Sequence, residues 1–140
     1  MLKIHNVCFA AAAALSLTAA TGAALAEERA SFLKGQYATA EQCAKLRKIE
    51  AGTPRTVETA PELLDETGFH GWEHGCTFTK VFEHDPGKSW AAIMICSEGV
   101  SMTPELYAFF KDETADRFEV SGTNDEQPET YERCDAKGGM

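Results

Sequence analysis

One short segment of the sequence holds most of the side chains that could do chemistry. Residues 68–76 read GFHGWEHGC and contain two histidines, a glutamate, two large aromatic residues and a cysteine among three glycines. Two histidines four residues apart share one face of a helix, where they could bind zinc. The glycines disfavour a helix, and a strand would hold His70 and His74 roughly 13 Å apart. We therefore predict no structural metal site, with a site at His70 and His74 as the alternative.

The same segment could instead form a binding loop. Aromatic side chains provide a large contact area at a low cost in conformational entropy. The candidate contact residues are Phe69, His70, Trp72, Glu73 and His74. The competing interpretation, which we favour from the sequence, is that Trp72 and Trp90 pack in the core. In either case the glycines indicate a bulged approach to a strand that contains Cys76.

Cysteines give the strongest structural signal in the chain. Cys8 lies in the N-terminal apolar segment, which leaves four cysteines for the folded domain. An even number of cysteines in a small exported domain indicates disulfides, and four cysteines allow three pairings. An oxidising compartment would also remove the free thiolate that a cysteine nucleophile needs.

The hairpin expected at residues 76–96 selects one pairing. Two β-rich runs flank the turn sequence DPGK. A turn centred between Pro86 and Gly87 pairs residues whose numbers sum to 173, whereas Cys76 and Cys96 sum to 172, and one bulged residue closes the difference. We therefore predict a Cys76–Cys96 disulfide, which leaves Cys43 to pair with Cys134.

The N-terminus has the pattern of a secretory signal peptide. A polar start is followed by an alanine-rich apolar run from Val7 to Leu17 and by the small-x-small sequence Ala24-Leu25-Ala26. The run is too short to anchor in a bilayer, which requires about 20 apolar residues. We expect cleavage after residue 26, a single domain at 27–140, a periplasmic or secreted location and no membrane insertion after cleavage.

The charge of the chain limits the classes of partner. It carries 22 acidic and 13 basic residues, a net charge of −9, and removing Lys3 with the signal peptide gives 12 − 22 = −10. Such a surface repels nucleic acid and anionic lipid. It would suit a basic partner, although a solvated acidic surface is the simpler explanation.

Helix and strand signals complete the layout. The segment TAEQCAKLRKIEAG predicts a helix. Thr39 and Gln42 form a capping box at its start, and the helix ends near Gly52. Residues 53–62 form a connector, and Leu63 and Leu64 begin a strand that ends at Gly68. Residues 104–111 suit a helix or a strand, and we favour a hairpin strand that pairs with RFEVSG; TYERC then closes the sheet.

These elements predict a mainly β (α+β) fold. We expect a small antiparallel meander that curls toward a barrel or sandwich, with one short N-terminal helix and two disulfides. The QC, GCTF, CSEG and YERC segments make the chain resemble small exported two-disulfide β-rich bacterial proteins of unknown function. That resemblance implies the disulfide-stabilised β fold and no activity.

No catalytic motif is present in the sequence. It lacks a G-x-S-x-G elbow, a C-x-x-C pair and a glycine-rich phosphate loop, so we predict neither an enzyme nor a cofactor. We expect a non-catalytic binding or inhibitory module that presents loops 68–75 and 97–103 to an unknown protein or small ligand. The alternative is a metal-handling protein that uses His70, Glu73 and His74, with the acidic loop near Asp125.

Overall fold

The computed structural model describes residues 28–52 and 59–134. The expected signal peptide, with Cys8, and most of the connector at 53–62 lie outside the described residues.

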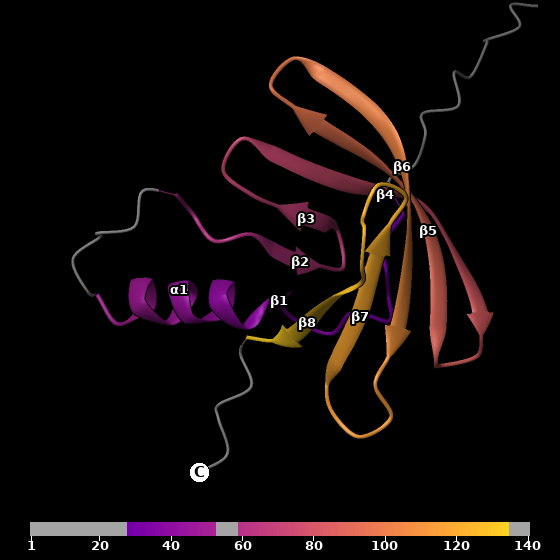
Figure 1. The fold of residues 1–140 in the computed structure, drawn as a ribbon, viewed down its shortest axis with the longest axis horizontal. Helices are drawn as coiled ribbons and strands as arrows, with labels where there is room; N and C mark the ends of the chain where they lie inside the picture. The colour runs from indigo at the N-terminus through magenta and orange to yellow at the C-terminus, as the bar shows by residue number, and fades with distance from the viewer. Residues whose placement is uncertain (1–27, 53–58, 135–140) are drawn as a thin grey trace, which may run out of the picture.

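Eight antiparallel strands form a closed barrel (Figure 1). Each strand pairs with the next one along the chain, and β1 pairs with β8 to close the sheet. The strands are β1 (Tyr37–Ala38), β2 (Leu63–Asp65), β3 (Gly68–His70), β4 (His74–Asp85), β5 (Ser89–Glu98), β6 (Ser101–Lys111), β7 (Arg117–Gly122) and β8 (Glu129–Arg133). The predicted meander is confirmed, and it closes as a barrel.

The central hairpin pairs the two predicted cysteines, but it contains two register shifts where one was expected. Cys76 lies directly opposite Cys96 and forms a disulfide with it. The pairing shifts by one residue between Phe78 and Lys80, which is the expected bulge, and again near the turn between Glu83 and Asp85. Local turn chemistry thus places the two cysteines face to face.

The ambiguous segment 104–111 belongs to a strand. β6 pairs with β5 on one side and β7 on the other. Its side chains alternate, since Phe109 is fully buried while Leu106 and Phe110 are about half exposed. This period of two is that of a strand, and the helical alternative is wrong. The turn before β6 is shorter than expected: only Gly99 and Val100 lie outside the strands.

The segment before Cys76 differs from the bulged approach expected from the sequence. β2 ends at Asp65, and β3 forms a separate hairpin with β4. Gly68 has φ +148°, and a Cβ there would lie 1.8 Å from the Cys76 carbonyl oxygen. A Cβ on Gly71 would lie 2.9 Å from His74 Nδ1. The glycines therefore allow a tight β3–β4 hairpin, which single-strand spacing could not predict.

Helix α1 (Ala40–Glu50) lies outside the barrel beside β1 and β8 (Figure 1). The Cys43–Cys134 disulfide connects it to the end of β8, as predicted. Only half of the capping box forms: Thr39 Oγ1 accepts a hydrogen bond from the Gln42 backbone N–H at 3.5 Å. The Gln42 side chain instead accepts one from the Glu62 backbone N–H at 3.3 Å.

Aromatic side chains fill the barrel. Phe32, from the segment before β1, stacks on Trp90 with ring centroids 4.3 Å apart and contacts Phe118 edge-on. Trp90 is buried, which confirms its predicted place in the core. Phe69 is also buried and packs against two tyrosine rings.

Two disulfides indicate folding in an oxidising compartment. No helix among the described residues is long and apolar enough to span a membrane.

Candidate functional site

The β3–β4 and β5–β6 turns lie next to each other at one end of the barrel. The pairing of β4 with β5 places His74 opposite Glu98, so the residues just before His74 and just after Glu98 are neighbours. The Gly99 backbone N–H points to the Glu73 carbonyl oxygen at 3.5 Å. Both turns project toward the side of the barrel that carries α1 (Figure 1).

These turns form one side of an open groove. The groove has a volume of about 1110 Å³, and segment 59–62 and α1 supply its other side. Its lining residues are Gln42, Thr59, Ala60, Glu62, Gly71, Trp72, Glu73, His74, Ser97, Glu98, Gly99, Val100 and Ser101. The structure therefore joins the two loops that the sequence analysis selected into one surface.

Two large apolar side chains of this groove are exposed. Trp72 has 62% of its surface exposed, and Val100 is fully exposed. The expectation that Trp72 packs in the core is therefore wrong: the tight turn after Gly71 directs it outward. Phe69, a candidate contact residue, lies in the core and is not available to a partner.

The groove is acidic. Glu62, Glu73 and Glu98 line it, and its described lining residues include no lysine or arginine. Glu62 lies 3.7 Å from His74, measured from Oε2 to Nε2. Within the described part of the chain, Glu73 and Glu98 make no side-chain ion pair or hydrogen bond. Their charges are thus left to solvent or to a ligand.

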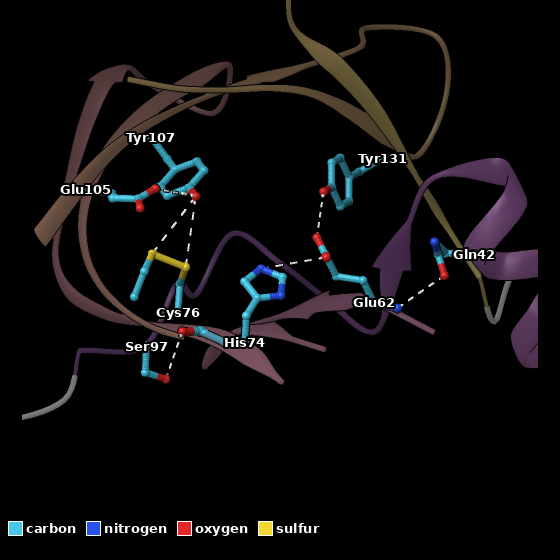
Figure 2. Close-up of polar contacts among 10 residues, drawn as sticks. Gln42, Glu62, His74, Cys76, Ser97, Glu105, Tyr107 and Tyr131 are labelled. Carbon is cyan, nitrogen blue, oxygen red and sulfur yellow. Dashed lines mark hydrogen bonds and ion pairs between the residues drawn. A yellow bond between two sulfur atoms is a disulfide. The ribbon is translucent and has the colours of Figure 1, made fainter. Parts of the chain in front are cut away.

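A polar cluster extends from the groove into the end of the barrel (Figure 2). It comprises Glu62, His74, Glu105, Tyr107 and Tyr131. The Tyr131 hydroxyl donates a hydrogen bond to Glu62 at 3.3 Å, and the Tyr107 hydroxyl donates one to Glu105 at 2.9 Å. The Tyr107 hydroxyl also lies 3.9 and 4.0 Å from the two sulfurs of Cys76 and Cys96.

Both tyrosines of this cluster are held in their neutral form. Burial raises the pKa of Tyr107 above its ordinary value, and the hydrogen bond to Glu105 and its charge raise it further. The pKa of Tyr131 is also raised, mainly by burial and next by the negative charge of Glu62. Raised pKa values make these phenols hydrogen-bond donors at neutral pH and not proton acceptors. The Tyr131 hydroxyl therefore acts as a donor that holds the Glu62 carboxylate in place.

The two candidate histidines have different partners. His70 Nε2 lies 3.1 Å from Asp65 Oδ1 and 2.9 Å from the Thr67 hydroxyl, whereas His74 faces Glu62. Burial acts to raise the pKa of Asp65, but hydrogen bonds from Thr67 and His70 outweigh it and lower that pKa. In residues 28–52 and 59–134, no group of three or more His, Cys, Asp or Glu side chains is arranged to hold a metal ion.

Several residues of the site were not selected from the sequence. Glu62, Gln42 and Tyr131 meet only because the barrel closes, since they are distant in the chain. Val100 was also not selected, although the sequence contains a signal for it: it is an isolated apolar residue after Gly99 in an expected turn, where its side chain would be exposed.

Comparisons with known proteins do not extend this description. No protein-family model matches the chain, and neither curated proteins nor solved structures give a significant match. Any functional conclusion must therefore come from the groove itself.

Proposed function

We propose that this protein is a small periplasmic or secreted, non-catalytic binding or inhibitory module. Its β3–β4 and β5–β6 turns contact a partner protein. The observation that carries the proposal is the exposure of Trp72 and Val100 on the same groove. Exposed aromatic residues grouped with other apolar side chains are typical of protein contact surfaces.

The two turns are crosslinked at their bases, which favours binding. Cys76 lies just after the β3–β4 turn and Cys96 just before the β5–β6 turn, so one disulfide connects their bases. The Ser97 hydroxyl donates a hydrogen bond to the Gly75 carbonyl oxygen at 3.4 Å between the same two strands (Figure 2). A surface that is ordered before binding loses less conformational entropy when a partner docks.

The proposal includes the export route. Residues 1–26 act as a signal peptide that is removed, and the chain is related to the small exported two-disulfide proteins that it resembles. Mass spectrometry of the exported protein tests this part: the mature chain should begin at Glu27. A protein retained inside the cell with residues 1–26 intact would contradict it.

Affinity capture with matched variants tests the binding function. The immobilised protein is exposed to envelope and medium extracts of the source organism, beside Trp72→Ala and Phe82→Ala. Phe82 is a suitable control because it is also a half-exposed aromatic residue but lies near the other end of β4.

A partner should be retained by the wild type and Phe82→Ala but not by Trp72→Ala. The loss of affinity should be at least about 30-fold, because a tryptophan hot spot contributes roughly 2 kcal/mol or more. Equal retention by all three proteins, or retention lost only with Phe82→Ala, would reject the groove as the binding site. Absence of any retained protein would reject the function.

A further inference from the structure

The charges of the groove specify the chemistry of its partner. Glu73 and Glu98 flank the two turns, and Glu62 also lines the groove. The Tyr131 hydroxyl fixes the Glu62 carboxylate by a hydrogen bond at 3.3 Å. Three carboxylates at the walls of a groove, with no lysine or arginine among its described lining residues, create a negative potential that a cation would relieve.

Trp72 adds a second preference for a cation. Its exposed indole forms part of the same groove. Lysine and arginine side chains bind well over indole faces, because the ring has a negative electrostatic face and the aliphatic stems pack on it. A carboxylate and an indole in one groove therefore favour a side chain with an apolar stem and a positive end.

We propose that the groove binds a lysine- or arginine-bearing segment of a partner protein. The basic side chain lies between Trp72 and the carboxylates of Glu73 and Glu98, and the charge of Glu62 adds to the attraction. This inference rests on the proposed function and adds the class of partner. Without residues 1–26 the net charge is 12 − 22 = −10, and this charge attracts a basic protein over a long range at low salt.

The size and form of the groove favour a protein segment over a small cation. The groove is open, and its volume of about 1110 Å³ is at the upper end of the roughly 300–1,000 Å³ of ordinary small-molecule pockets. Val100 also lines the groove and is fully exposed, at the tip of the β5–β6 turn. A partner loop could cover this apolar tip and place a basic side chain inside at the same time.

Selection from a defined library tests the inference. The probe is a small rigid scaffold with a randomised loop, displayed on phage and selected against the wild-type protein at low salt. Selected loops are then measured against Trp72→Ala, the Glu73→Gln/Glu98→Gln double variant and a control double variant, Glu83→Gln/Glu113→Gln.

The control has the same change in charge at the other end of β4 and in the β6–β7 loop. Glu83 accepts a hydrogen bond from the Gly87 backbone N–H at 2.8 Å, and a glutamine amide oxygen can still accept it. Glu113 forms only an exposed ion pair with Lys88. Near-ultraviolet circular dichroism confirms that all variants are folded.

The selected loops should be enriched in lysine and arginine and should lose binding with Trp72→Ala. Glu73→Gln/Glu98→Gln should weaken them about tenfold, the size expected for two partly exposed charge pairs, and the control should not. The difference in affinity between the wild type and Glu73→Gln/Glu98→Gln should become smaller when the salt concentration rises from about 0.05 M to 0.5 M, because salt screens exposed charges.

Three other outcomes would contradict the inference in different ways. Loops that need Trp72 but carry no excess of basic residues would reject the basic partner and leave the binding function standing. Loops that bind independently of Trp72, or no selected loops, would reject the binding function as well. Free spermidine, tested by calorimetry, should bind more weakly than the loops; tighter binding would replace the protein partner by a small polyamine.

Discussion

Cys76 and Cys96 face each other across β4 and β5 with their Cα atoms 3.9 Å apart, so their disulfide crosslinks adjacent strands of one sheet. Cys43 and Cys134 have Cα atoms 5.0 Å apart and join α1 to the end of β8. The first bridge supports the two turns of the groove. The second holds the helix from which Gln42 reaches the Glu62 backbone.

The two disulfides should differ in their effect on stability. In the chain-entropy model, a disulfide stabilises the fold by lowering the entropy of the unfolded chain. This stabilisation is about 4.6 kcal/mol for Cys43–Cys134, which are 91 residues apart, and about 3.3 kcal/mol for Cys76–Cys96, which are 20 residues apart. The backbone hydrogen bonds of β4 and β5 also remain after their bridge is removed. Calorimetry should therefore show a lower melting temperature for Cys43→Ala/Cys134→Ala than for Cys76→Ala/Cys96→Ala. The reverse order would mean that packing around the Cys76–Cys96 bridge outweighs chain entropy.

The fold could be predicted where its cause is local in the sequence. The turn residues between Cys76 and Cys96 set their register, and Thr39 marks the start of α1. The aromatic residues Tyr107, Phe109 and Phe110 favoured a strand, although the sequence also allowed a helix there. In each case a few neighbouring residues determine the structure.

The candidate site could be predicted only in part, because barrel closure creates it. Glu62 is 20 residues from Gln42 and 69 residues from Tyr131, and no local pattern announces either contact. The exposure of Trp72 depends on the turn after Gly71, and hydrophobicity alone assigned it to the core. The glycine and turn residues therefore located the loops, but not which of their side chains are exposed.

Alanine at Gly68 should destabilise the fold more than alanine at Gly87. Both glycines have positive φ, which costs another residue about 1–3 kcal/mol. A Cβ on Gly87 meets nothing within 4 Å, whereas one on Gly68 would lie 1.8 Å from the Cys76 carbonyl oxygen. Denaturant unfolding of Gly68→Ala and Gly87→Ala measures the difference. Equal losses of unfolding free energy would mean that β3 does not approach β4 as closely as described.

Metal removal should leave the stability of the protein unchanged. His70 is hydrogen-bonded to Asp65 and Thr67, while His74 faces Glu62, so the two imidazoles do not share one site. A metal bound only by the native state would stabilise it by mass action. Differential scanning calorimetry with and without a chelator should give one melting temperature, and His70→Ala/His74→Ala should cost less than about 1 kcal/mol. A fall of several degrees that zinc or copper reverses, and that the double variant lacks, would establish metal handling instead.

Alkaline titration should show that all three tyrosines of the chain ionise abnormally late. Burial, together with a hydrogen bond to Asp116, raises the pKa of Tyr37 from 10.0 to about 12, and the pKa values of Tyr107 and Tyr131 are also raised. The folded state thus favours the neutral phenol. This contribution to stability is complete below pH 10, the pKa of an unfolded tyrosine, and is lost as the pH rises from 10 through about 12.

Tyrosinate absorbance near 295 nm and near-ultraviolet circular dichroism, recorded on the same samples, measure this directly. The native protein should show almost no tyrosinate at pH 10, where an exposed tyrosine is half ionised. Ionisation at higher pH should coincide with the loss of tertiary signal, because the buried phenolates are accommodated only when the barrel opens. Tyr37→Phe removes the hydrogen bond to Asp116 and should shift the remaining ionisation little, since Tyr107 and Tyr131 donate to other carboxylates. Ionisation of a tyrosine near pH 10 with the tertiary signal intact would show that its hydroxyl is open to solvent and does not belong to the buried network.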